Sequence, residues 1–150
     1  MKLAKNFTLA ELTFSQIATR HNIDNAPNKS QINNLILLAN NILQPVRNHF
    51  QSVVIISSGY RCPQLNKLIG GASSSQHLNG EAADFEVINK TNYEVAEYIA
   101  NNLTFDQLIL EFYIPGQPTS GWVHCSYKNS NNRKEVLTIN KNGTFKGLLK

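Results

Sequence analysis

Hydrophobic residues recur at every third or fourth position over residues 30–50, which is the period of an amphipathic helix laid on a sheet. We predict that this helix begins at Ser30 and that Pro45 kinks it, because proline lacks a backbone N–H. Shorter helices are predicted at residues 9–12 after Thr8, at residues 16–21 after Ser15, at residues 63–69, and after Thr91.

Short apolar or alternating runs predict strands in the rest of the chain. The continuous apolar run at residues 53–56 predicts a buried strand. Further strands are predicted at residues 82–87, 106–112, 122–127, 135–139 and 144–148. The last four of these runs are expected to pair as two antiparallel hairpins. Because helices come early and hairpins late, the predicted fold class is α+β, an antiparallel sheet with helices packed on one side.

Length and composition favour one folded unit over residues 1–150. The chain has 150 residues, 41% of them hydrophobic, which suits a single core of moderate size. No apolar run approaches the roughly 18 to 20 residues of a membrane span, and the first ten residues lack the apolar stretch of a secretory signal. We therefore expect no membrane partner. Cys62 and Cys125 are too few for a disulfide framework and match no zinc-finger spacing.

The net charge of +4 is concentrated near the C-terminus. Residues 1–127 hold 8 Lys or Arg and 9 Asp or Glu, whereas residues 128–150 hold 6 and 1. We predict that residues 128–150 form a basic C-terminal hairpin. Two interpretations of its charge stand side by side. It is either a solvated hairpin or a segment that attracts an anionic polymer, such as nucleic acid or cell wall.

The segment from Ser75 to Asp84, with the sequence SQHLNGEAAD, carries the most specific chemical pattern. His77 ends a loop, and Asp84 lies seven residues later in a predicted strand. Gly80 permits a turn between them, and the small Ala82 leaves room beside a neighbouring group. An imidazole and a carboxylate can therefore converge on one point, where a third ligand would complete a metal site.

The predicted hairpin supplies a third ligand. Side chains alternate between the two faces of a strand, so Trp122 and His124 share the more polar face of residues 122–127. Glu111 lies on the same face of the preceding strand, close enough to serve one site if the two strands pair in that register.

His77, Asp84 and His124 form the ligand set expected of one catalytic zinc ion, because two His and one Asp leave a fourth position open. Peptide hydrolysis also needs a group that takes and returns a proton, and Glu111 is the candidate. Arg61 follows the predicted strand at residues 53–56. It is a fixed cation able to bind a carboxylate or stabilise an oxyanion.

These residues resemble those of the zinc D-alanyl-D-alanine carboxypeptidases and L-alanyl-D-glutamate endopeptidases of bacteria and phages, which share a fold with the Hedgehog signalling domain. The family pattern Ser-x-His-x-x-Gly-x-Ala-x-Asp is matched in full by residues 75–84. Ser-Gly-Tyr-Arg matches residues 58–61, and Trp-x-His matches residues 122–124. The resemblance spans residues 7–127, and its opening is like that of the phage-type branch.

The resemblance implies a role for each matching position. These roles are zinc binding by His77, Asp84 and His124, and substrate contact by Arg61 and Ser75. Apart from the resemblance, Trp122 either walls the site or packs in the core. Many family members place the catalytic carboxylate three residues before the final His, where this chain has Gly121. Either Glu111 takes that role from the neighbouring strand, or catalysis is weakened or lost. Arg61 and Ser75 also have structural alternatives, namely an ion pair with an acid such as Glu86 and a cap of the loop.

The function that these residues predict is a zinc metallopeptidase that cleaves the peptide stems of bacterial peptidoglycan, as a D-Ala-D-Ala carboxypeptidase or an endopeptidase. We expect a monomer that contacts peptidoglycan peptide and no nucleic acid. The alternative from another class is a noncatalytic peptidoglycan-binding or virion structural module that retains the fold, and Gly121 favours it. A Hedgehog-like signalling domain is a third interpretation.

Overall fold

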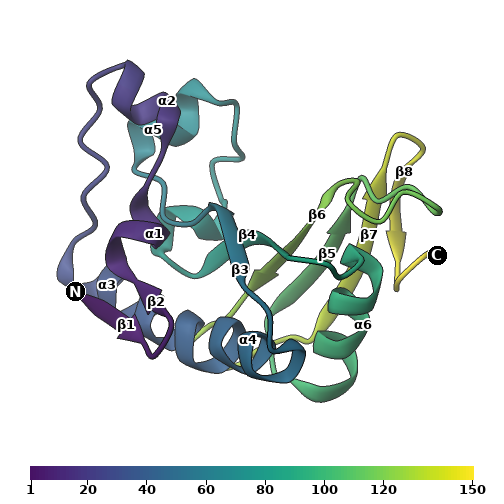
Figure 1. Ribbon diagram of the computed structural model, residues 1–150. Coiled ribbons are helices and arrows are strands. Elements are labelled where there is room, and N and C mark those ends of the chain that lie inside the picture. Colours follow the sequence, from purple (N-terminus) through teal and green to yellow (C-terminus); the bar gives the residue numbers. More distant parts are fainter.

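Six strands form one mixed sheet in the order β3-β4-β6-β5-β7-β8 in the computed structural model, which describes residues 1–150 (Figure 1). The strands are β3 (Val54–Ser58), β4 (Ala82–Val87), β5 (Gln107–Glu111), β6 (Trp122–Ser126), β7 (Glu135–Asn140) and β8 (Gly143–Lys146). A separate two-stranded sheet joins β1 (Lys2–Ala4) and β2 (Phe7–Thr8).

The α+β class is confirmed, and so are both predicted hairpins, β5 with β6 and β7 with β8. The sheet is not purely antiparallel, however, because β7 runs parallel to β5. The reason lies in the connection between β6 and β7. The antiparallel strand β6 ends where β5 begins, and β7 starts from that same end, since the Glu135 N–H donates to the Asp106 carbonyl oxygen.

Six α-helices accompany the sheets (Figure 1). They are α1 (Leu9–Thr13), α2 (Gln16–Arg20), α3 (Lys29–Leu38), α4 (Gln44–Phe50), α5 (Pro63–Leu68) and α6 (Asn92–Asn102). None of them has the length and apolar character needed to cross a membrane.

One face of the large sheet forms the hydrophobic core. Phe85, Leu110 and Val123 are fully buried and point from β4, β5 and β6 into this core. Ile42 and Ile99 meet them from the helical layer. Burial of each large apolar side chain contributes about 1.5–3 kcal/mol, so this packing determines which face of each strand turns away from the helices. The alternate residues of the same strands therefore point to the open face.

The predicted N-caps of three helices are confirmed: Thr8 for α1, Ser15 for α2 and Thr91 for α6. The prediction that the long helix begins at Ser30 is wrong, because α3 begins at Lys29 with Asn28 as its N-cap. Asn28 and Gln31 form a capping box in which each side chain accepts a hydrogen bond from the backbone N–H of the other. Two N–H groups that the helix leaves free are thereby satisfied.

A π-helical turn interrupts the predicted long helix just before Pro45. Residues Ala39–Leu43 make this turn between α3 and α4, and Pro45 is the second residue of α4. A missing backbone N–H costs little at the start of a helix. The apolar stripe therefore continues into α4 although the hydrogen-bond pattern of the helix changes before Pro45.

The prediction of a buried strand at residues 53–56 is wrong, because β3 is an edge strand. Val53 and Ile55 are 48% and 49% exposed, whereas Val54 is buried. The β3 strand has a neighbour on one side only, and its side chains are buried on the core face alone. A continuous apolar run therefore does not mean here that both faces of the strand are covered.

Candidate metal centre

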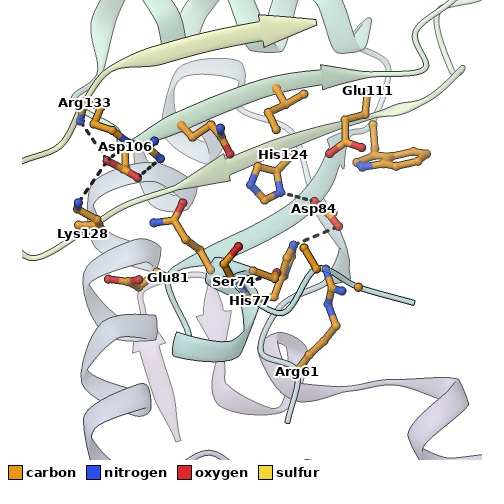
Figure 2. A pocket seen from close by; sticks show the side chains of 17 residues that line it. Arg61, Ser74, His77, Glu81, Asp84, Asp106, Glu111, His124, Lys128 and Arg133 are labelled. Carbon is orange, nitrogen blue, oxygen red and sulfur yellow. Dashed lines mark hydrogen bonds and ion pairs between the residues drawn. The ribbon is translucent and has the colours of Figure 1, made fainter. Parts of the chain in front are cut away.

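A cleft of about 790 Å³ lies over the open face of the sheet, and Figure 2 shows the side chains that line it. Strands β4, β5 and β6 contribute its floor, and one wall is formed by Arg61 and by residues 71–72 and 74–77. All seven residues that the sequence singled out line this cleft: Arg61, Ser75, His77, Asp84, Glu111, Trp122 and His124.

Strand register places three of these side chains near one another. Asp84 lies opposite His124 in the β4–β6 pair, and Glu111 lies opposite Trp122 in the β5–β6 pair. Since Trp122 and His124 are two residues apart on β6, Glu111 is the diagonal neighbour of His124. The structure thus has the shared face that the alternation of residues 106–112 and 122–127 predicts.

His77 reaches the same point from the 3₁₀ turn η2 (Gln76–Asn79). Ser75 caps this turn by accepting a hydrogen bond from the His77 N–H, and Gly80 ends it in the left-handed conformation with a φ of 73°. The Nδ1 of His77 lies 2.7 Å from the Gly59 carbonyl oxygen, and its Nε2 lies 3.4 Å from Oδ2 of Asp84. A carbonyl can only accept a hydrogen bond, so Nδ1 carries the proton and Nε2 is left as a ligand atom.

His77, Asp84 and His124 present one ligand atom each, and all three atoms lie within 4.8 Å of one another. The Nδ1 of His124 is 2.9 Å from Oδ1 of Asp84. Ligand atoms about 2.0–2.2 Å from a tetrahedral zinc ion lie roughly 3.5 Å apart, so small side-chain shifts would bring these atoms to that spacing. The donor types and the fixed ring of His77 therefore fit a zinc ion.

The charge of Asp84 is held by its two histidine neighbours. Burial opposes the charged form of this carboxyl, but the hydrogen bond with His124 and the adjacent ring of His77 outweigh it and leave the pKa of Asp84 below its usual range. The carboxylate is therefore ionised at neutral pH, which is the state that can bind a cation.

Glu111 stands beside this cluster with a different electrostatic balance. Burial raises the pKa of its carboxyl, and the charge of Asp84 raises it further, while His124 and then Trp122 act in the opposite direction. The indole Nε1 of Trp122 is buried and makes no hydrogen bond of ordinary geometry. A carboxylate with a raised pKa is a stronger base than an exposed glutamate, which suits it to take up and return a proton.

Gly121 has a backbone conformation that excludes a side chain. Its φ is 66°, and a Cβ there would overlap the carbonyl oxygen of Glu111 and the backbone of Phe112. A carboxylate three residues before His124 is therefore incompatible with this backbone. Glu111 is the cleft carboxylate whose charge interacts with Asp84 and His124.

Arg61 lines the cleft from the loop between β3 and α5. Its Nη1 donates a hydrogen bond of 2.9 Å to Oδ1 of Asn66, and its Nε is buried without a partner. Burial lowers the pKa of the guanidinium, and the charges of Asp84 and Glu111 act in the opposite direction. The hydrogen-bond partner of this side chain is Asn66 rather than Glu86, the acid considered for a structural ion pair.

Two other residues next to the ligands have packing or capping roles. Ser75 caps η2, which is its structural alternative, and it lines the cleft as well. Cys125 is fully buried on the core face of β6, and burial raises the pKa of its thiol. A buried neutral thiol of this kind is chemically inert.

An ion-pair cluster at the other end of the cleft was not indicated by the sequence (Figure 2). The buried Asp106 accepts hydrogen bonds of 3.1 Å and 2.8 Å from Nε and Nη2 of Arg133, and Nζ of Lys128 lies 3.8 Å away. Burial opposes the charge of Asp106, but Arg133 and Lys128 outweigh it and lower its pKa. No local pattern links these residues, because the contact depends on the parallel pairing of β7 with β5.

Comparison with known protein families agrees with this geometry. A family model described as Peptidase M15 matches residues 5–126, a range that contains every candidate ligand and the candidate base. The fold and the matched residues define a metallopeptidase. The chain belongs to the peptidase M15 family, which confirms the resemblance in its motifs at the level of the family. No curated protein matches the chain.

Proposed function

We propose that this protein is a zinc metallopeptidase that cleaves the peptide stems of bacterial peptidoglycan. The observation that carries the proposal is the convergence of His77, Asp84 and His124 in one cleft, with Glu111 on the same face of the sheet. The family match supports a peptidase, and the peptidoglycan substrate comes from the motif resemblance.

His77, Asp84 and His124 would hold the zinc ion, and a bound zinc ion supplies Lewis-acid polarisation of a substrate carbonyl. Nε2 is the ligand atom of His77, since Nδ1 is engaged by the Gly59 carbonyl oxygen. Asp84 contributes a full negative charge, because its pKa lies below the usual range. These three protein ligands would leave a fourth ligand position open, as catalytic zinc sites require.

Glu111 is the general base and acid in this proposal. Its carboxyl stands beside His124 on the neighbouring strand and has a raised pKa, so it can accept a proton from the attacking nucleophile and return it to the leaving amine. Gly121 leaves no space for a carboxylate at the position that many family members use. In this proposal the catalytic carboxylate therefore lies at the end of β5 rather than in the loop before β6.

Arg61, Ser75 and Trp122 are proposed to bind the substrate. The guanidinium of Arg61 is partly buried, which strengthens its attraction for a substrate carboxylate or a developing oxyanion. Trp122 forms a wall of the cleft beside Glu111. The hydroxyl of Ser75 already caps η2, and its place in the cleft lining gives it access to a peptide as well.

A noncatalytic peptidoglycan-binding or virion structural module is the second candidate function, and Gly121 is the observation that favours it. If only the missing position can support catalysis, the cleft would bind a stem peptide without cutting it. The two candidates share the fold and the metal ligands. They differ in whether a covalent bond of the peptidoglycan is broken.

Digestion of purified peptidoglycan discriminates between the two candidates. The zinc-loaded protein is expected to release fragments whose masses identify the cleaved bond, and a chelator should stop the release until zinc is restored. Loss of a terminal D-alanine would identify a carboxypeptidase, and internal cleavage of the stem an endopeptidase. Binding to the peptidoglycan with no new termini under zinc-replete conditions would establish the noncatalytic module instead.

A further inference from the structure

Two buried asparagines outside the predicted site restrain Arg61, one through its side chain and the other through the backbone of its neighbours. Asn66 on α5 is 4% exposed and accepts the hydrogen bond from Nη1 of Arg61 at 2.9 Å. Its own Nδ2 donates to the carbonyl oxygen of Ala72 at 2.9 Å. One amide side chain thus joins the guanidinium to Ala72, which belongs to the wall of the cleft.

Asn25 fixes the backbone on both sides of Arg61. Its Nδ2 donates to the Tyr60 carbonyl oxygen at 3.0 Å, and its Oδ1 accepts from the Cys62 N–H at 2.7 Å. The N–H of Arg61 itself donates to the His77 carbonyl oxygen at 3.1 Å. The Cα of Arg61 is therefore held relative to a candidate metal ligand, and Asn66 restrains the other end of the side chain.

Gly71 provides the space in which the contact between Asn66 and Arg61 forms. A Cβ at this position would overlap Oδ1 of Asn66 and lie 2.8 Å from Nη1 of Arg61. The N–H of Gly71 also donates to the Asn66 carbonyl oxygen at 2.8 Å. A side chain at residue 71 would therefore disturb the hydrogen bond without removing either partner.

The contacts leave part of the guanidinium free. Arg61 has five N–H donors, Asn66 engages Nη1, and the buried Nε has no partner. The carboxylates of Asp84 and Glu111 lie near enough to act on its charge, yet neither forms an ion pair with it. A guanidinium whose rotamer is already restrained loses less entropy when it binds an anionic group.

We propose that Asn66 is a positioning residue that holds Arg61 in the cleft for a peptide bearing a carboxylate. This inference rests on the proposed function, because it assigns the restrained guanidinium to substrate. Asn66 contacts no substrate itself and acts through Arg61. The competing view is that Asn66 only stabilises the end of α5 and the loop that follows.

Kinetics of a carboxylate-bearing stem peptide separate the two views. Asn66→Ala and Gly71→Ala are each expected to raise KM about tenfold with a smaller change in kcat, because a hydrogen bond to a charged group is stronger than one between neutral groups. In the Arg61→Ala background neither substitution should raise KM further. Equal effects in both backgrounds would assign Asn66 to structure alone. Thr138→Val removes buried hydrogen bonds on β7, away from the cleft, and controls for lost stability.

A spectroscopic measurement tests the inference without any activity. The chain has four arginines, so the ¹⁵N signal of the Arg61 Nε–H can be assigned by its loss in Arg61→Lys. The Nε–H itself has no hydrogen-bond partner and is protected by burial. Loss of the Nη1 bond should let the side chain move toward solvent, so exchange of the Nε proton with water should accelerate at least about tenfold in Asn66→Ala and in Gly71→Ala. The Nε–H of Arg133, bonded to Asp106, is the internal reference and should not change. An unchanged Arg61 signal contradicts the positioning role.

Failure of the proposed function can be told apart from failure of this inference. A wild-type protein that neither binds nor cleaves the peptide refutes the proposed function, while the Arg61 signal still decides whether Asn66 holds Arg61.

Discussion

His77 is the residue on which the proposed zinc site depends most, because its ring is restrained on both edges. Nδ1 is bonded to the Gly59 carbonyl oxygen, Nε2 faces Asp84, and the side chain is 2% exposed. A histidine held in this way would present its free ring nitrogen to a zinc ion without a search among rotamers. His124, on β6, is less enclosed and finds its place through the strand register.

We predict that His77→Ala abolishes stable zinc binding. The reconstituted wild-type protein should hold about one equivalent of zinc and the variant less than about one tenth, as measured by atomic emission after gel filtration. His49→Ala is the matched control, since His49 stacks on Tyr98 and takes no part in the cluster. Unchanged zinc in His77→Ala would show that the ion binds elsewhere.

At the scale of single elements, the start of α3 gives a direct comparison between the sequence prediction and the structure. Asn28→Ala should lower the free energy of unfolding by about 1 kcal/mol, because it removes the capping box with Gln31. Ser30→Ala should change it by less than about 0.5 kcal/mol, because Ser30 is exposed inside the helix. Urea denaturation measures both values. A larger loss of stability in Ser30→Ala than in Asn28→Ala would contradict the cap at Asn28 and favour a helix that begins at Ser30.

The turn that leads into β6 gives a second prediction at this scale. Gly121 and Gly116 both have positive φ, but a Cβ at Gly116 would meet nothing within 4 Å, whereas at Gly121 it would overlap the Glu111 carbonyl oxygen. Gly116→Ala should therefore cost about 1–2 kcal/mol of stability for the backbone conformation alone. Gly121→Ala should cost clearly more, and Gly121→Asp should not raise peptidase activity. Equal losses for the two alanine variants, measured by urea denaturation, would contradict the steric argument.

Asp106 connects two distant parts of the molecule. It lies just before β5 and pairs with Lys128 and Arg133 in the basic segment after β6. Its pKa is lowered in the folded state, so its ionisation stabilises the fold above the unfolded value of about 3.9. This contribution is lost as the pH falls from there through the folded-state pKa. Two of the six basic residues after residue 127, Lys128 and Arg133, are engaged by this one carboxylate.

We predict that Asp106→Asn lowers the free energy of unfolding by about 2–3 kcal/mol at pH 7. The difference from wild type should shrink once the pH falls below about 3.9, where the wild-type carboxylate begins to lose its charge. Urea denaturation at a series of pH values measures this. Asp24→Asn, in an exposed loop, should follow the wild-type curve. A difference between Asp106→Asn and wild type that does not depend on pH would contradict the ion-pair account.

Much of the fold and of the candidate cluster is predictable because it follows from local periodicity. Alternation along residues 106–112 and 122–127 places Glu111 and His124 on one face, and the structure has that face. The residues that the sequence does not reveal are set by contacts between distant segments. Asn66 is an ordinary polar residue of a short helix until Arg61 is placed beside it, and Asp106 meets Arg133 only through the parallel strand β7.

The sequence does not predict the edge position of β3 or the parallel pairing of β7, and the physical reason is the same for both. Each depends on which strand becomes the neighbour, and the hydrophobic pattern of a single strand carries no such information. The start of α3 differs for a local reason, because Asn28 and Gln31 satisfy each other's N–H groups and the helix therefore begins at Lys29, before Ser30.

The central claim is that this cleft breaks a peptide bond with Glu111 as the proton carrier. The most direct test is the rate at which new termini appear in purified peptidoglycan treated with wild-type protein or Glu111→Gln, at equal measured zinc content. We predict fragments from the wild-type protein and a rate at least about a hundredfold lower from the variant, since general acid–base catalysis contributes 10²–10⁴-fold. Equal rates from the two proteins, or no fragments from zinc-loaded wild type, would contradict the account.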